Sequence, residues 1–144
     1  MTGPLDGIKI FDLTRVLAGP SCVQILGDLG ADVIKVEPTD GDTTRRLVHQ
    51  GAGFFASYNR NKRSLAIDLK SENGLRVAKA LCENSDVVVE NLRPSALEES
   101  GLGYAALSKK NPRLIYCALK GFLDGPYAHR KALDEVVQMM GGLA

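Results

Sequence analysis

The segment from Ile8 to Pro38 constrains the fold most, because it reads as strand, loop, helix and strand in close succession. An apolar run at residues 8–13 predicts one strand, and residues 32–37 predict another. Between them, a loop of small residues leads into a helix that begins near Pro20. Such a loop lets backbone N–H groups approach a ligand, and the start of a helix carries partial positive charge suited to phosphate. The segment therefore indicates half of a nucleotide-type binding crevice.

This interpretation has an equal alternative, which is an ordinary strand–helix–strand unit that binds no ligand. The dinucleotide-binding fingerprint G-x-G-x-x-G does not occur in the segment, so a dinucleotide site is not indicated. The pattern alone does not decide between a binding crevice and an empty unit.

The rest of the chain also alternates strands with helices. Apolar runs at 86–91 and 114–119 are typical of strands that a parallel sheet buries on both faces, and 64–69 alternates as a strand should. Further helices are expected at 53–60, after the N-cap Ser71, at 104–109, and from Leu133 toward Met140. We therefore expect an α/β fold with a mainly parallel sheet.

Parallel strands gather their binding loops at one edge of the sheet. Because ligands on such sheets sit at the carboxyl ends of the strands, the loops at 14–20, 37–42, 68–71 and 91–94 should share one edge.

Length and composition limit the kinds of partner. The 144 residues fit one domain with a real core, and a hydrophobic content of 44% is ordinary for a globular protein. A net charge of +1 gives no electrostatic reason to expect nucleic acid or an anionic membrane as a partner. No apolar run approaches the roughly 18–20 residues of a transmembrane helix, and the N-terminus lacks the regions of a signal peptide.

The three cysteines predict a reducing compartment. Cys22, Cys82 and Cys117 are widely spaced and form no C-x-x-C motif. We expect them to be buried reduced thiols in a cytoplasmic or organelle-matrix protein. His49 and His129 show no metal-ligand spacing, so no metal site is predicted.

The basic run at 59–64 contains Arg60, Lys62 and Arg63. It lacks interleaved aromatic residues and belongs to a nearly neutral chain, which disfavours binding to nucleic acid. We expect these cations to order the rim of the crevice or to lie in a solvated loop.

Five collinear segments carry a resemblance to a known family. They are PLDG (4–7) with DLTRVLAGP (12–20), DLGADVIKVE (28–37) with GD (41–42), NRNKRS (59–64) with DLK (68–70), VVENLRP (88–94), and NPRLI (111–115) with GPY (125–127). In this order and spacing they resemble the N-terminal part of the family III CoA-transferases, also called the CaiB/BaiF family. The resemblance covers essentially the whole chain. It implies a Rossmann-like, mainly parallel sheet with flanking helices, with residues 1–144 as a single CoA-binding domain.

The resemblance implies three regions of contact with coenzyme A or an acyl-CoA, which is the expected substrate. One lies beside the thioester, one reaches the nucleotide and pantetheine, and one lies at the start of the last helix. The implied contact residues are Arg15, Val16, Leu17, Ala18, Ile67, Asp68, Leu69, Lys70, Asn91, Leu92, Arg93, Lys131 and Asp134.

Three of these residues suit the phosphates of CoA by their chemistry. Lys70, Arg93 and Lys131 are reasonable phosphate partners, although solvated surface charge is an equal alternative for each. Formyl-CoA transferases often have Arg at the position of Pro38 and a basic residue at the position of Glu99. Both departures weaken a claim to formyl or oxalyl substrates.

The resemblance implies that CoA moves from an acyl-CoA thioester to a carboxylic acid acceptor through a covalent intermediate on an aspartate. That aspartate is expected beyond Ala144, so no catalytic residue is assigned in this chain, and the chain alone is expected to be inactive. Asp134 is better interpreted as an acid at a helix start. Full-length members form homodimers, and loss of the later part of the large domain would expose apolar surface.

Three alternatives stay open. A non-catalytic CoA-binding or partner subunit would complete a site in another polypeptide, and a plain structural domain would bind no CoA. An acyl-CoA racemase or epimerase is disfavoured, because the racemases have histidine where this chain has Leu133.

Overall fold

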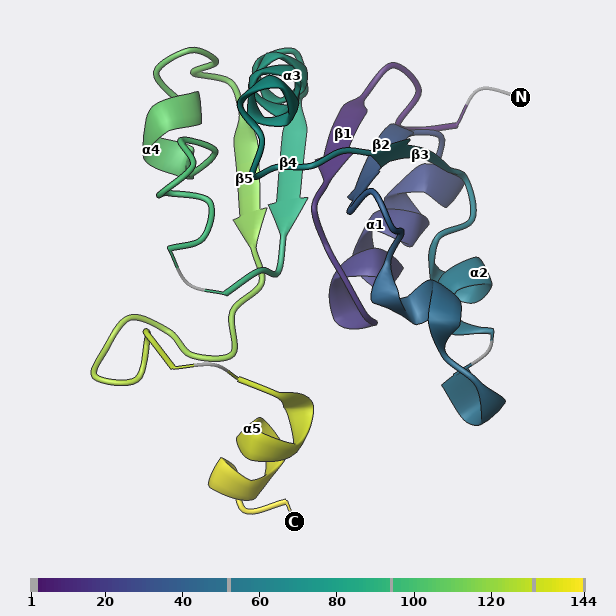
Figure 1. Ribbon diagram of the computed structural model, residues 1–144, viewed down its shortest axis with the longest axis vertical. Coiled ribbons are helices and arrows are strands. Elements are labelled where there is room, and N and C mark those ends of the chain that lie inside the picture. Colours follow the sequence, from purple (N-terminus) through teal and green to yellow (C-terminus); the bar gives the residue numbers. More distant parts are fainter. Residues whose placement is uncertain (1–2, 52, 94, 131, 144) are drawn as a thin grey trace.

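A five-stranded parallel sheet forms the centre of the molecule in the computed structural model, which describes residues 3–51, 53–93, 95–130 and 132–143, without the side chains of residues 50, 134 and 135. The strand order is β3-β2-β1-β4-β5 (Figure 1). The strands are β1 (Lys9–Asp12), β2 (Asp32–Glu37), β3 (Lys62–Ala66), β4 (Val87–Glu90) and β5 (Ile115–Ala118). The order reverses between β1 and β4, as in a Rossmann-like fold. This confirms the predicted α/β fold.

Helices connect the strands near the predicted positions. They are α1 (Ala18–Asp28), α2 (Phe54–Tyr58), α3 (Glu72–Glu83), α4 (Tyr104–Leu107) and α5 (Asp134–Met140), with 3-10 turns η1 (Thr43–Arg46) and η2 (His49–Gly51). Pro20 lies in the first turn of α1, where a backbone N–H has no partner within the helix. The Ser71 hydroxyl accepts a hydrogen bond from Gly74 N at 3.1 Å, which confirms the predicted N-cap of α3.

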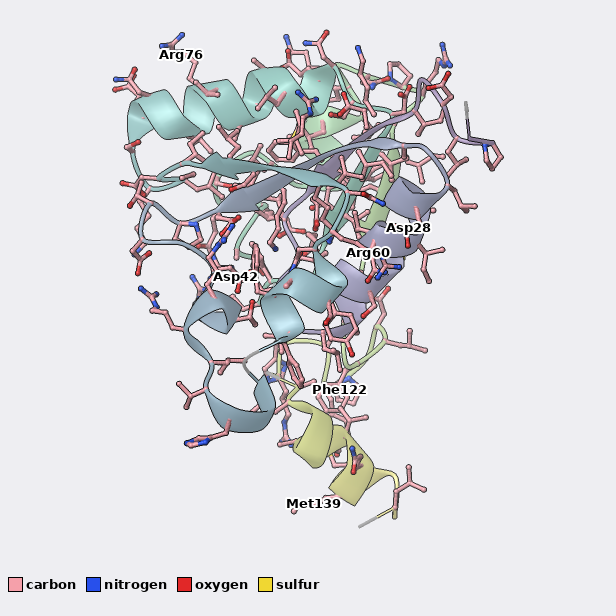
Figure 2. The ribbon with its side chains drawn as sticks, turned by 90° about the vertical axis from the view of Figure 1, so that its right-hand side faces the viewer. Asp28, Asp42, Arg60, Arg76, Phe122 and Met139 are labelled. Carbon is pink, nitrogen blue, oxygen red and sulfur yellow. The ribbon has the colours of Figure 1, made fainter. Side chains whose placement is uncertain are left out.

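Two apolar cores lie on opposite faces of the sheet, because successive side chains of a strand point to opposite sides. Ile10 packs with Val23 of α1 on one face. Phe11 packs with Ala78 and Cys82 of α3 on the other face, which α4 also covers. Figure 2 shows Arg76 of α3 and Asp28 of α1 on opposite sides of the strands. Burial from both sides explains the apolar run at β4.

The prediction that β5 is buried on both faces is wrong. Ile115 is 64% exposed, and Cys117 and Ala118 are exposed as well. The physical reason is that β5 is an edge strand and that α1 packs against β1, β2 and β4 instead. The strand expected at 64–69 also differs in its bounds, since β3 covers Lys62–Ala66. It ends there because Asp68 begins a turn, in which its carboxylate accepts a hydrogen bond from Lys70 N at 2.9 Å.

The C-terminal helix α5 stands apart from the sheet in Figure 1. Its side chains Val136, Val137, Met139 and Met140 are 39–66% exposed, which agrees with the expectation of exposed apolar surface. Within the described residues, no helix has both the length and the apolar character needed to cross a membrane.

The prediction of three buried thiols is correct for one cysteine only. Cys82 lies on the inner face of α3 and is fully buried, whereas Cys22 and Cys117 are exposed. Cys22 lies on the outer side of α1, and Cys117 lies on the uncovered face of the edge strand β5. Burial raises the pKa of the Cys82 thiol to about 12, which suppresses its reactive thiolate form.

This difference in burial predicts the outcome of thiol labelling. With Ellman's reagent at pH 8, two thiols should react rapidly in the native protein, and the third should react only after denaturation. The Cys22→Ser, Cys117→Ser double variant should then show no rapidly reacting thiol. Rapid labelling of Cys82 in the folded double variant would contradict the assigned burial.

Candidate functional site

A groove lies at the carboxyl edge of the sheet, where four loops meet. One cavity of about 270 Å³ is lined by Leu13, Arg15, Val36, Glu37, Pro38, Ile67, Leu69, Lys70 and Leu92. A second cavity of about 610 Å³ is lined by Arg15, Leu69, Lys70, Leu92, Arg93, Ala96, Leu97, Glu99 and Ser100. Because the two cavities share Arg15, Leu69, Lys70 and Leu92, they are adjoining parts of one site, here named the carboxyl-edge groove.

The carboxyl-edge groove combines an apolar floor with a cationic rim. The floor residues Leu13, Val36, Ile67, Leu69 and Leu92 belong to the α3-side core or pack against it. Its cationic side chains are those of Arg15, Lys70 and Arg93. The Arg93–Glu99 ion pair is long, at 3.8 Å, and each side chain is 66% exposed, so solvent screens it strongly. The arrangement suits an anionic ligand with an apolar part.

The groove brings together many of the predicted contact residues. Those that line it are Arg15, Ile67, Leu69, Lys70, Leu92 and Arg93. Val16, Leu17 and Ala18 are exposed on the neighbouring loop and the start of α1, but they do not line it. Asp68 is exposed, and its carboxylate caps its own turn.

The predicted contact region around the last helix is only partly described. Lys131 lies outside the described residues, as does the side chain of Asp134, the first residue of α5. A hollow of about 230 Å³ adjoins the groove through Leu92 and Arg93, and Arg130 and Leu133 also line it. The segment before α5 therefore lies beside one end of the groove, and its contact with CoA stays a prediction.

Asn91 bridges the point where the strand order reverses. Its Oδ1 accepts a hydrogen bond from Arg15 N, and its Nδ2 donates one to Arg15 O, both at 2.8 Å. The side-chain amide is thus engaged with the backbone of the loop after β1. Within the site, Asn91 positions Arg15.

The same loop contains a strained backbone. Val16 has φ of 68°, in the left-handed region that a β-branched residue rarely adopts. Such a conformation costs on the order of 1–3 kcal/mol and persists only where its surroundings impose it. No motif in the sequence indicates this strain.

A glycine allows α3 to approach the loop that carries Lys70. A Cβ added at Gly74 would lie 2.0 Å from Asp68 O, which is a severe clash with backbone. Only glycine fits this close approach, and the position of Lys70 at the groove depends on it.

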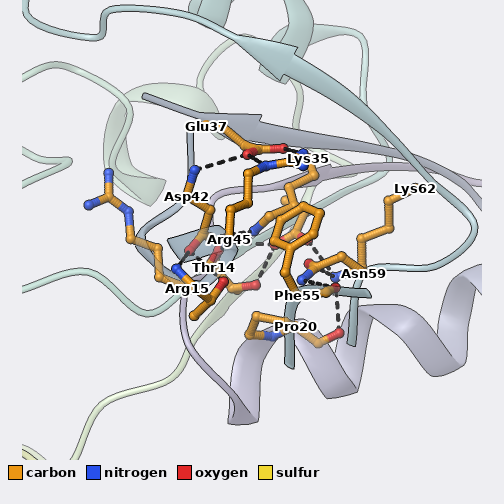
Figure 3. Close-up of polar contacts among 12 residues, drawn as sticks. Thr14, Arg15, Pro20, Lys35, Glu37, Asp42, Arg45, Phe55, Asn59 and Lys62 are labelled. Carbon is orange, nitrogen blue, oxygen red and sulfur yellow. Dashed lines mark hydrogen bonds and ion pairs between the residues drawn. The ribbon is translucent and has the colours of Figure 1, made fainter. Parts of the chain in front are cut away.

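A buried polar network, which the sequence patterns did not predict, supports the groove from the α1 side of the sheet (Figure 3). Glu37 accepts hydrogen bonds from Arg45 Nε at 2.6 Å, from Ser64 Oγ at 2.7 Å and from Asp42 N at 3.0 Å. The Arg45 guanidinium also lies 3.6 Å from the centre of the Phe55 ring. The feature of the sequence that could have indicated this network is a charged residue, Lys35, between the apolar residues of β2.

Lys35 and Lys62 are the buried cations of this network, each with a side-chain exposure of 1%. Lys62 forms an ion pair with Asp12 at 2.9 Å, and Lys35 forms one with Asp42 at 3.1 Å. Burial lowers the pKa of Lys62, although Asp12 opposes this shift. Burial also raises the pKa of Asp42, but the hydrogen bonds from Thr44 and the charge of Lys35 outweigh it and leave the pKa lowered.

The basic run at 59–64 has a structural role, but Arg60 and Arg63 pair with the end of α1 and the start of β2, at the amino edge of the sheet, and not at the rim of the groove as expected. Arg60 pairs with Asp28 at 2.5 Å, and Arg63 pairs with Asp32 at 2.6 Å. Lys62 belongs to the buried network described above. Among the described residues, no group of three or more His, Cys, Asp or Glu residues is arranged to hold a metal ion.

The Glu37–Arg45 pair predicts acid-sensitive stability. The Arg45 hydrogen bond lowers the pKa of Glu37 to about 2, from an ordinary value of 4.5. The contribution of this pair is therefore fully present above pH 4.5 and is lost as the pH falls toward 2. Because Arg45 is partly exposed, we expect Arg45→Met to lower the free energy of unfolding by only about 1 kcal/mol at pH 7.

Urea denaturation at pH values from 7 to 2.5 measures this effect. Arg45→Met should show a shallower decrease of unfolding free energy with falling pH than the parent protein. Arg46→Met is the matched control, because its ion pair with Asp40 is exposed on both sides. Equal pH dependence in the parent and Arg45→Met would contradict the assignment.

Comparison with known proteins relates this chain to an enzyme family. Residues 5–144 match the sequence model of CoA-transferase family III. The chain is 47% identical to succinyl-CoA:glutarate CoA-transferase of Mus musculus, over 97% of this chain and 34% of the relative. It is 42% identical to formyl-CoA:oxalate CoA-transferase of Streptomyces avermitilis, over 99% of this chain and 36% of the relative. The chain thus spans about a third of the length of these curated relatives.

Solved structures agree with the sequence comparison. A CAIB/BAIF family protein from Brucella suis superposes with a TM-score of 0.90 and 44% identity, over 99% of this chain and 40% of that chain. A protein from Mycobacterium tuberculosis superposes with a TM-score of 0.93 and 38% identity, with the same coverage. The sequence match over nearly the whole chain and the common fold show that this chain belongs to CoA-transferase family III.

Proposed function

We propose that this chain supplies the CoA-binding part of a CoA-transferase, which moves CoA from an acyl-CoA thioester to a carboxylic acid. The observation that carries the proposal is the carboxyl-edge groove. Residues from three separate loops, each expected from the sequence to contact CoA, line it together: Arg15, Ile67, Leu69, Lys70, Leu92 and Arg93.

The chemistry of the carboxyl-edge groove matches the chemistry of CoA. The adenine ring and the pantetheine arm offer apolar surface to the leucine-rich floor, and the phosphates offer negative charge to Lys70 and Arg93. The combined hollow lies within the size range of ordinary ligand sites. The proposed thioester end lies along the loop from Arg15 to Ala18, whose residues are exposed and leave its outer side open to an acyl group.

The proposed reaction proceeds through an aspartate that is still predicted to lie beyond Ala144. Its carboxylate attacks the thioester carbonyl carbon, the C–S bond breaks, and CoA leaves as thiolate with a mixed anhydride behind it. The thiolate attacks the aspartyl carbonyl, which releases the donor acid and forms an aspartyl-CoA thioester. The acceptor carboxylate then attacks this thioester, its C–S bond breaks, and CoA thiolate leaves behind a second mixed anhydride. The thiolate attacks the acceptor carbonyl carbon of this anhydride, which forms the acceptor acyl-CoA and releases the aspartate as free carboxylate.

Two groove residues restrict the proposed substrates. Pro38 and Glu99 line the groove. By the family resemblance, formyl-CoA transferases often have basic residues at these two positions. These departures weaken a claim to formyl or oxalyl substrates. The proposal therefore covers acyl-CoA donors and acid acceptors as classes and names no particular acyl group.

Replacement of Lys70 tests CoA binding. Because Lys70 is exposed at the groove and is expected to meet a phosphate, Lys70→Met should weaken CoA binding roughly tenfold, or by about 1.4 kcal/mol. Isothermal titration calorimetry with CoA measures the change. Lys110→Met is the control, because Lys110 is also exposed but precedes β5 at the opposite edge of the sheet. Equal affinity in both variants would overturn this placement of CoA.

Because the proposed nucleophilic aspartate is expected outside residues 1–144, we predict that this chain does not transfer CoA by itself. An assay that follows transfer from an acyl-CoA to a carboxylate by mass spectrometry should show no product above the uncatalysed level, while calorimetry still detects CoA. Transfer by the purified chain would contradict the missing nucleophile. Copurification with a second polypeptide that restores transfer would favour a partner subunit instead.

A further inference from the structure

We infer that Lys35 and Lys62 are positioning residues, whose buried ammonium groups fasten the two ends of the loop between β1 and α1. This loop, residues 13–17, presents Arg15 to the carboxyl-edge groove. The expectation that the geometry of this loop affects acyl-CoA binding rests on the proposed function. The attachment of the loop by the two lysines does not, because it follows from their hydrogen bonds and ion pairs.

Lys35 holds the beginning of the loop. Its Nζ donates a hydrogen bond to Thr14 O at 2.9 Å and forms an ion pair with Asp42 Oδ2 at 3.1 Å. The other oxygen of Asp42 accepts hydrogen bonds from Thr44 N at 2.9 Å and from Thr44 Oγ1 at 2.7 Å. The ammonium group therefore connects the loop to a carboxylate that η1 keeps in place, as Figure 3 shows.

Lys62 holds the other end, at the start of α1. Its Nζ contacts Asp12 Oδ2 at 2.9 Å, Pro20 O at 3.0 Å and Asn59 Oδ1 at 3.1 Å. All three ammonium protons are thereby used. This one group connects the end of β1, the first turn of α1 and the residue that follows α2 (Figure 3).

Asn91 holds the middle of the loop through both backbone groups of Arg15, at 2.8 Å each. Between these attachments lies Val16, whose φ of 68° is unfavourable for its side chain. A loop in this conformation would relax if it were free. The contacts from β2, β3 and the end of β4 oppose that relaxation.

The two lysines do not serve as phosphate ligands. Neither lines the groove, and both side chains are 1% exposed, so an anion in the groove does not reach them. A buried ion pair also adds little stability over apolar packing of similar volume. What each ammonium supplies beyond packing is a directed bond to one backbone carbonyl, Thr14 O in the loop for Lys35 and Pro20 O in the first turn of α1 for Lys62.

Native-state amide hydrogen exchange tests the inference directly. In Lys35→Met and in Lys62→Met, the amides of residues 13–15, which donate hydrogen bonds in the parent, should exchange at least tenfold faster than in the parent, while amides of β4 stay within threefold. Leu107→Ala is the control for general destabilisation, because Leu107 is buried in the α3-side core but belongs to α4, away from the loop and from β4. It should not accelerate the loop selectively.

A second variant protects the test against misfolding. If Lys35→Met does not fold, Asp42→Asn removes the charge that anchors Lys35 and leaves the lysine in place. Selective acceleration of the amides of residues 13–15 in Asp42→Asn supports the inference. Unchanged loop exchange in the folded variants overturns it.

Ligand titration separates this inference from the proposed function. Lys35→Met should bind adenosine 3′,5′-bisphosphate, the nucleotide end of CoA, within twofold of the parent, but should bind acetyl-CoA at least fivefold more weakly. Equal loss for both ligands, or for neither, contradicts a role at the thioester end. If the parent binds neither ligand, the proposed function fails, and hydrogen exchange still decides whether the lysines fasten the loop.

Discussion

The loop after β1 begins with buried residues whose backbone polar groups must find partners within the protein, and the rest of the site depends on how they do so. Thr14 is fully buried, and its carbonyl meets the ammonium of Lys35. The parallel pairing of β1 with both β2 and β4 brings Lys35 and Asn91 to the two sides of this loop. The same pairing places the groove-lining loops at one edge, so support and site share one cause.

The order of the elements and the position of the groove were predictable from the sequence, because both follow from short-range patterns. Apolar runs at 32–37 and 86–91 correspond to β2 and β4, and Ser71 caps α3 as expected. The parallel arrangement then places the loops at Lys70 and Leu92 together without further information. The family resemblance identified these positions as contacts, which periodicity alone does not do.

The remainder depended on tertiary contacts that a local pattern does not contain. The apolar sequence of β5 is compatible with a central or an edge strand, and only the packing of α1 over β1, β2 and β4 leaves Ile115 exposed. The strain at Val16 and the close approach of Gly74 to Asp68 likewise arise from neighbours distant in the sequence or from backbone geometry.

Burial divides the cations of this chain into two chemical classes that composition does not distinguish. Lys35 and Lys62 are buried, and carboxylates and carbonyls accept their hydrogen bonds, so their charge holds the loop in place and is not available to a ligand. Lys70 and Arg93 lie at the open groove and keep donors for a ligand. Lysine occurs in both classes because its four methylene groups carry a point charge, which reaches across a strand when buried and extends into solvent when exposed. A phosphate of the ligand can therefore bind only the exposed cations. The buried lysines keep their contacts with the loop whether or not ligand is bound.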